Sequence, residues 1–135
     1  MKSSNLMYNV KRVCMDIHKQ YGPGLLEKTY HQILKLKLEK LGYDVKSEVM
    51  CPLNVEGKVI EDAYRIDLLV NDVLIIELKA VLRLEAVHHR QLITYMTLSN
   101  KPEGLLVNFC CDDIFKEGLK SWNKDSIKRA YRSSY

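Results

Sequence analysis

Residues 73–80 read Val-Leu-Ile-Ile-Glu-Leu-Lys-Ala, so two charged side chains stand inside an otherwise apolar segment of strand length. Side chains alternate along a strand, which places Glu77 and Lys79 on the same face. The preceding apolar segment, residues 63–70, carries a further carboxylate, Asp67. Both segments are apolar on both faces, which predicts central strands of a sheet that is covered on two sides. Burying an ionised group is costly unless something pairs with it, so these charges need a partner or a function.

The two carboxylates could share a metal ion. Two carboxylates held close together raise each other's pKa unless a cation lies between them. A hard divalent cation such as Mg²⁺ or Mn²⁺, bound by carboxylate oxygens, removes that repulsion. The alternative is a buried ion pair of Lys79 with Glu77 or Asp67 that only stabilises the fold. The functional interpretation is favoured because replacing such ion pairs by apolar residues is often neutral or stabilising.

The connection between the two strands tests the metal hypothesis. If Asn71-Asp72 formed a two-residue hairpin loop, Asp67 would lie across from Ile76, and the carboxylates would face opposite sides of the sheet. A connection with one more residue, or a bulge, places Asp67 directly across from Glu77. We therefore expect a three-residue connection or an equivalent bulge at residues 71–73.

The spacing of apolar residues predicts the other elements. In chain order these are a helix over residues 5–20, a second helix that ends at Gly42, an edge strand or bend over 45–55 around Pro52, a helix over 84–98, a short strand over 104–109 and a short helix over 114–122. Together with the two central strands, the order is ααβββαβα. This order predicts an α/β fold with a central mixed sheet flanked by helices.

The composition places the chain among folded domains. Its 135 residues are 47% hydrophobic and 28% charged, which is typical of a single folded domain over residues 1–135. No apolar run approaches the roughly 18 residues of a membrane span, and the first eight residues lack a secretory apolar region. The four cysteines have no C-x-x-C spacing, which favours reduced thiols and a cytoplasmic protein.

The positive charge is concentrated at the C-terminus. From residue 116 onward the chain has six Lys or Arg residues against two acidic ones, so this segment carries the whole net charge of +4. Three aromatic residues, Trp122, Tyr131 and Tyr135, lie among them. Basic and aromatic side chains together suit a nucleic-acid backbone, whereas the simpler interpretation is a solvated, frayed tail.

Several motifs resemble a known family of nucleases. Asp67 followed by Glu77-x-Lys79 resembles the signature of the PD-(D/E)XK nuclease superfamily, although Ile66 stands where a proline often precedes the aspartate. Residues 24–30, Gly-Leu-Leu-Glu-Lys-Thr-Tyr, resemble the G-x-x-E-x-x-Y motif that names the GxxExxY family, a small stand-alone branch. Similar stretches occur at residues 64–70, 76–80, 91–95 and 106–109, and Gln91-x-x-x-Tyr95 resembles the helix motif of RecB-like members.

The resemblance implies a restriction-endonuclease-like core and a Mg²⁺-dependent phosphodiesterase site. It implies that Asp67 and Glu77 bind the metal, with the Leu78 carbonyl as a third protein oxygen. Lys79 would orient or deprotonate the attacking water, or stabilise the developing charge. The resemblance also implies that Glu27 is a ligand, either to this metal, directly or through water, or to a second metal. Gln91 and Tyr95 would face the site and contact Lys79, a water or the scissile phosphate. The remaining site candidates are Tyr30, whose hydroxyl could hold a carboxylate or phosphate, Arg65, which could bind a phosphate, and His88, near the same helix face as Gln91.

Each of these candidates also has a structural alternative. Glu27 can complement the dipole of its helix, Tyr30 can be a core tyrosine, and Arg65 can form a surface ion pair. A zinc site at His88 and His89 is not favoured, because adjacent residues diverge on a helix.

The resulting functional hypothesis is a metal-dependent nuclease that acts on DNA in preference to RNA. Two alternatives are a nucleic-acid- or partner-binding module without turnover and a hydrolase of smaller phosphodiesters. We also expect a homodimer, since one small subunit offers little surface to a duplex.

Overall fold

The computed structural model describes residues 3–131, with side chains from residue 5 onward. Its described strands form one mixed sheet in the order β1-β2-β3-β4-β5, in which β3 and β4 are parallel and the other neighbours antiparallel. The strands are β1 (Val45–Val55), β2 (Lys58–Val70), β3 (Leu74–Lys79), β4 (Glu103–Asn108) and β5 (Leu119–Asn123).

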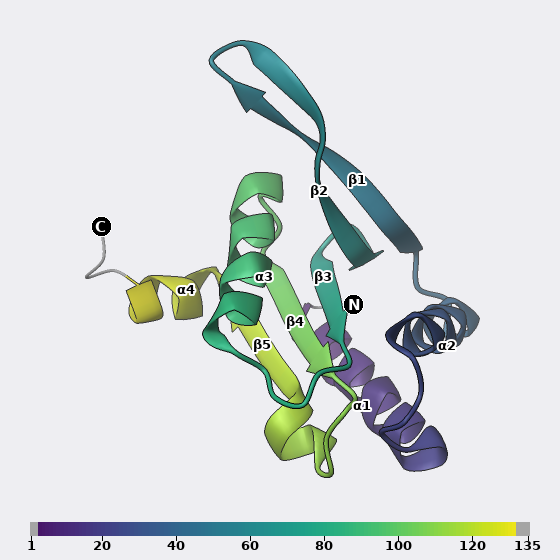
Figure 1. Ribbon diagram of the computed structural model, residues 1–135. Coiled ribbons are helices and arrows are strands. Elements are labelled where there is room, and N and C mark those ends of the chain that lie inside the picture. Colours follow the sequence, from purple (N-terminus) through teal and green to yellow (C-terminus); the bar gives the residue numbers. More distant parts are fainter. Residues whose placement is uncertain (1–2, 132–135) are drawn as a thin grey trace.

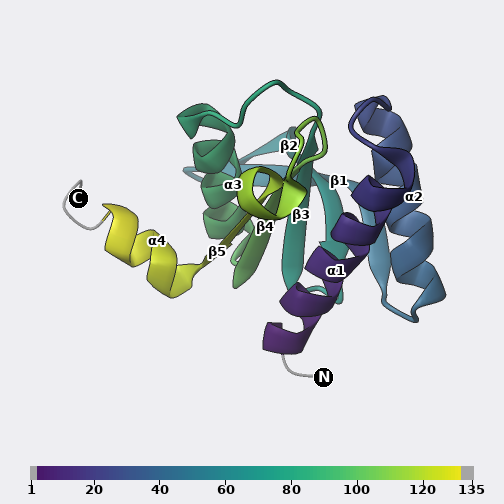
Figure 2. The same ribbon diagram turned by 90° about the horizontal axis from the view of Figure 1, so that it is seen from below.

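Helices cover both faces of the sheet, as Figures 1 and 2 show. The helices are α1 (Ser3–Tyr21), α2 (Glu27–Lys40), α3 (Ala86–Ser99) and α4 (Lys124–Tyr131). One buried cluster joins α1 and α2 to the sheet, and another joins it to α3, with Ile127 of α4 packed against the latter. This arrangement confirms the α/β prediction and is consistent with a restriction-endonuclease-like fold. Among helices within residues 3–131, none has the length and apolar character to cross a membrane.

The prediction of a helix over residues 114–122 was wrong. A π-helical turn, Ile114–Gly118, is followed by β5, which pairs antiparallel with β4. Leu119 is buried and the next residues alternate in exposure, so this segment completes the sheet by covering the outer edge of β4. The following residues form α4, so the tail is not frayed up to Tyr131. Arg132 and Tyr135, also assigned to the basic segment, lie outside the described residues.

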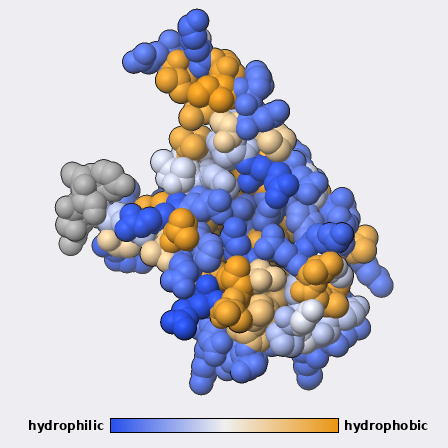
Figure 3. All heavy atoms as spheres, viewed as in Figure 1, coloured by the Kyte–Doolittle hydropathy of each residue, from blue (hydrophilic) through white to orange (hydrophobic). Residues whose placement is uncertain are grey.

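Strands β1 and β2 extend beyond the body of the protein as a two-stranded arm (Figure 1). β2 pairs with β3 only through residues 68–70, and the rest of its length pairs with β1. Residues 63–65 were expected to be covered on both faces, but they are exposed or half-buried. They belong to the part of β2 that pairs with β1 and not with β3, so they lie in the arm. Apolar side chains gather near the tip of the arm (Figure 3). The exposed ones next to the turn are Val55, Val59 and Ile60, and Met50 is exposed further along β1.

Candidate active site

The register between β2 and β3 brings two carboxylates together. Val70 pairs with Leu74, so three residues form the connection, as expected from the sequence. The same register, continued by one residue beyond the paired segment, places Asp67 directly across from Glu77. Both residues are buried, with 8% of Asp67 and 4% of Glu77 exposed.

The carboxylates replace the main-chain ladder where the two strands separate. The main-chain N–H of Asp67 donates to Glu77 Oε2 at 2.9 Å, and the N–H of Leu78 donates to Asp67 Oδ2 at 2.9 Å. One oxygen of each carboxylate therefore accepts a hydrogen bond from a main-chain N–H of the neighbouring strand. In a regular sheet a main-chain carbonyl would accept that hydrogen bond. The second oxygen of each carboxylate takes no part in these two hydrogen bonds.

The pKa of Glu77 is shifted by its surroundings. Burial raises it to about 8, and the negative charge of Asp67 adds to this increase. The charges of Lys79 and Arg65 act in the opposite direction. Arg65 Nη2 lies 3.5 Å from Asp67 Oδ1, and its Nη1 lies 3.7 Å from Glu48 Oε1. Because the Arg65 side chain is 52% exposed, this ion pair contributes little and leaves the guanidinium open to a ligand.

The donor set fits a hard divalent cation. Two adjacent carboxylates, each with one oxygen outside the main-chain hydrogen bonds, are the ligands that Mg²⁺ uses together with several waters. Within residues 3–131 no group of three or more His, Cys, Asp or Glu side chains could hold a metal. Glu27 is exposed at the first position of α2, so it does not complete a three-carboxylate cluster with the pair. Its contact through water, or with a second ion, stays a prediction.

Helix α3 supplies the polar groups beside the carboxylates. Lys79 Nζ donates to Gln91 Oε1 at 3.2 Å. One helical turn further, the pKa of Tyr95 is raised by burial and by the charge of Glu77, while an interaction with Gln91 lowers it. The ring of Tyr95 stacks on Tyr64 with centroids 5.0 Å apart. Gln91 therefore links Lys79 and Tyr95, two of the residues that the family resemblance places at the site.

A glycine lies where α3 packs closely against β4. A Cβ at Gly104 of β4 would lie 2.5 Å from Met96 Sδ and 2.9 Å from Leu92 Cδ1. Both atoms are the ends of flexible side chains, so a larger residue at position 104 would require the Met96 and Leu92 side chains of α3 to move. Gly104 is thus a point of close packing between α3 and β4.

Two predicted site candidates have structural roles. The Tyr30 hydroxyl donates to the Gly22 carbonyl and accepts from the Leu25 N–H, and its fully buried ring stacks on Phe109. These contacts anchor the loop before α2, as the core alternative expects, and a contact of Tyr30 with a carboxylate or phosphate stays a prediction. His88 Nδ1 accepts the main-chain N–H of Glu85 at the start of α3, which makes it a helix cap.

Asn108 was missed in the sequence analysis. It pairs with Lys79 in the β3–β4 register and is 2% exposed. Its Oδ1 accepts the Val81 N–H at 3.0 Å, and its Nδ2 donates to the Val81 carbonyl at 2.9 Å. Asn108 therefore fixes the chain two residues after Lys79. The signal was a polar residue at the end of the apolar run 105–107.

Comparison with known proteins assigns the family. The model of the PD-(D/E)XK nuclease superfamily matches residues 4–121. The chain belongs to this superfamily. No curated protein matches it. A solved structure titled "Crystal structure of SSO0001" is 21% identical, covers 90% of this chain and 68% of that chain, and gives a TM-score of 0.44.

Proposed function

We propose that this PD-(D/E)XK protein is a metal-dependent nuclease of the GxxExxY branch, which hydrolyses phosphodiester bonds of nucleic acid, DNA in preference to RNA. The observation that carries the proposal is the register that sets Asp67 across from Glu77, with Lys79 held beside them by Gln91. Membership of a nuclease superfamily supports the same chemistry.

Asp67 and Glu77 would hold Mg²⁺ or Mn²⁺, with the Leu78 carbonyl as a further oxygen. Such a cation supplies polarisation of a phosphoryl oxygen and lowers the pKa of bound water. To serve as ligands, both carboxylates must be ionised, so Glu77 has to lose the proton that burial favours.

The cationic side chains have separate tasks in this proposal. Lys79, oriented by its hydrogen bond to Gln91, would donate to a phosphoryl oxygen or to the attacking water. Arg65, half exposed at the edge of the pair, would bind the phosphate in place of Glu48. The Tyr95 hydroxyl, which interacts with Gln91, would keep the amide in position.

The test is cleavage of single-stranded, double-stranded and branched DNA and RNA with Mg²⁺ or Mn²⁺, and with chelator. We expect metal-dependent cleavage that falls about 100-fold or more in Glu77→Gln and Asp67→Asn, because several kcal/mol of transition-state stabilisation are lost. Glu39→Gln, an exposed carboxylate on α2, is the matched control and should cleave normally. Cleavage unaffected by chelator or by Glu77→Gln would refute the proposal.

Binding of nucleic acid without cleavage in any condition would instead support the alternative, a catalytically silent binding module on the same fold. Cleavage confined to small phosphodiesters would support a hydrolase of nucleotides. Homodimer formation and cytoplasmic location stay predictions.

A further inference from the structure

A groove lies between α3 and α4. It consists of two adjoining hollows of about 220 and 450 Å³ that share Thr97 and Ile127 in their walls. The α3 residues that line it are Arg90, Ile93, Thr94, Met96 and Thr97, and Asn100 follows directly after the helix. Helical periodicity places most of them on the side of α3 opposite Gln91 and Tyr95, so the helix separates the groove from the carboxylate pair.

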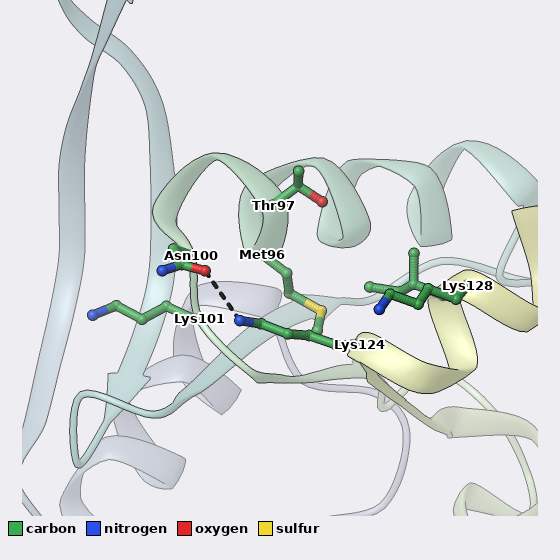
Figure 4. Close-up of a pocket in the computed structure, with 7 residues that line it drawn as sticks. Met96, Thr97, Asn100, Lys101, Lys124 and Lys128 are labelled. Carbon is green, nitrogen blue, oxygen red and sulfur yellow. Dashed lines mark hydrogen bonds between the residues drawn. The ribbon is translucent and has the colours of Figure 1, made fainter. Parts of the chain in front are cut away.

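The groove has basic side chains in its walls. Of the eleven described residues that line it, four are basic, namely Arg90, Lys101, Lys124 and Lys128, and none of the eleven is Asp or Glu. Lys124 extends from α4 and donates to Asn100 Oδ1 at 3.1 Å (Figure 4). Lys101 forms an ion pair with Asp72 at 2.8 Å, outside the groove. The remaining positive charge favours a polyanion.

Tertiary contacts hold α4 in place against α3. The guanidinium carbon of Arg90 on α3 lies 5.3 Å from the ring centroid of Tyr131 on α4. On β5, which leads into α4, Trp122 Nε1 donates to His89 Nδ1 of α3 at 3.0 Å. Ile127 packs on the buried cluster beneath α3. The superfamily match ends at residue 121, so the wall formed by α4 lies outside the matched region.

We propose that this groove binds a single-stranded segment of nucleic acid, which adds a second contact surface to the active site. The proposal rests on the proposed function in taking nucleic acid as the ligand. Hollows of about 220 and 450 Å³ are too small to enclose a duplex, so the groove admits one strand. Cations that follow a backbone and an aromatic ring at the rim, here Tyr131, are the features by which proteins bind single strands.

The test measures binding in chelator, where no cleavage can occur. A fluorescein-labelled single-stranded oligodeoxynucleotide of about 15 nucleotides is titrated with protein at several salt concentrations, and its anisotropy is followed. In Lys124→Gln/Lys128→Gln we expect binding to weaken several-fold and the slope of log K against log salt to fall by about 1.4, since each phosphate contact on a single strand contributes about 0.7. Lys19→Gln/Lys40→Gln removes the same charge from α1 and α2 and is the matched control.

Trp122 gives an independent readout, because it is the single tryptophan and its ring lies 6.2 Å from that of Tyr131. Its fluorescence should change when the wild-type protein binds the strand, and much less in the groove variant. Equal salt slopes for the two double variants would overturn the proposal. So would equal affinity for a duplex of the same sequence, or failure of the wild type to bind. If the groove variant weakens binding as expected but no condition gives cleavage, the proposed nuclease activity is refuted and the groove proposal stands. If the protein cleaves but the two double variants have equal salt slopes, the groove proposal is refuted and the nuclease proposal stands.

Discussion

Asp67 on β2 and Glu77 on β3 lie directly across from each other, and the main-chain N–H of Asp67 donates to Glu77 Oε2 at 2.9 Å. At this point β2 leaves β3 and continues with β1 as the arm. The carboxylates satisfy main-chain donors that the departing strand would otherwise leave unpaired. The carboxylate pair of the candidate site therefore lies where β2 and β3 cease to pair.

The pKa of Glu77 predicts how the stability of the metal-free protein depends on pH. Its folded pKa of about 8 is raised above the ordinary value of 4.5, so the folded state holds a proton that the unfolded state releases. The stabilisation is therefore complete below about pH 4.5 and is lost as the pH rises to about 8. We expect the free energy of unfolding, measured with urea in chelator, to fall by at most about 1.4 kcal/mol per pH unit across this range.

Glu77→Gln should abolish this slope, because the amide does not titrate. Glu39→Gln should retain it. A wild type and a Glu77→Gln variant with the same pH dependence would show that Glu77 ionises normally.

Asn108→Ala should destabilise the protein by about 1–3 kcal/mol, because the Val81 N–H and carbonyl both lose their partner. Thermal or urea unfolding measures the loss. Asn54→Ala is the control, since its side chain accepts one hydrogen bond from Gly57 in an exposed turn, and it should cost less. Equal losses at the two positions would argue against a stabilising role for the two hydrogen bonds between Asn108 and Val81.

Tyr30→Phe separates the two roles considered for Tyr30. Removal of the hydroxyl leaves the Gly22 carbonyl and the Leu25 N–H without their partner, so we expect a loss of about 1–2 kcal/mol in the free energy of unfolding. The cleavage rate and KM should be unchanged. An increase in KM without loss of stability would instead indicate a phosphate contact. Tyr8→Phe, at an exposed hydroxyl on α1, is the control.

Gln91→Leu tests whether the amide orients Lys79. The ammonium would lose the acceptor that lies 3.2 Å away, and the rate of cleavage should fall about 10- to 100-fold, as for other residues that orient a catalytic group. The free energy of unfolding should hardly change, because Gln91 is only half-buried. Gln32→Leu on α2 provides a matched surface change. Full activity in Gln91→Leu would show that Gln91 does not orient Lys79 for cleavage.

Local patterns in the sequence predict most of the architecture. Charges inside apolar strands indicated the Asp67–Glu77 pair, and the requirement that they meet predicted the three-residue connection. The spacing of Gln91 and Tyr95 predicted their common face. These inferences succeed because alternation and helical periodicity depend only on neighbours along the chain.

The features that the sequence did not predict depend on contacts between distant parts of the chain. Residues 119–123 become a strand because the edge of β4 is free to pair, which no local pattern reveals. The hydrogen bonds of Asn108 to Val81 follow from the parallel pairing of β3 and β4, whose register the sequence does not specify.

We propose that Asp67 and Glu77 bind one divalent cation. Isothermal titration calorimetry with Mg²⁺, at a pH above 8 so that Glu77 is ionised, tests it most directly. We predict one ion bound per chain in the wild type and in Glu39→Gln, and none in Asp67→Asn or Glu77→Gln. Equal binding by the wild type and both site variants, or a wild type that binds no ion, would contradict the account.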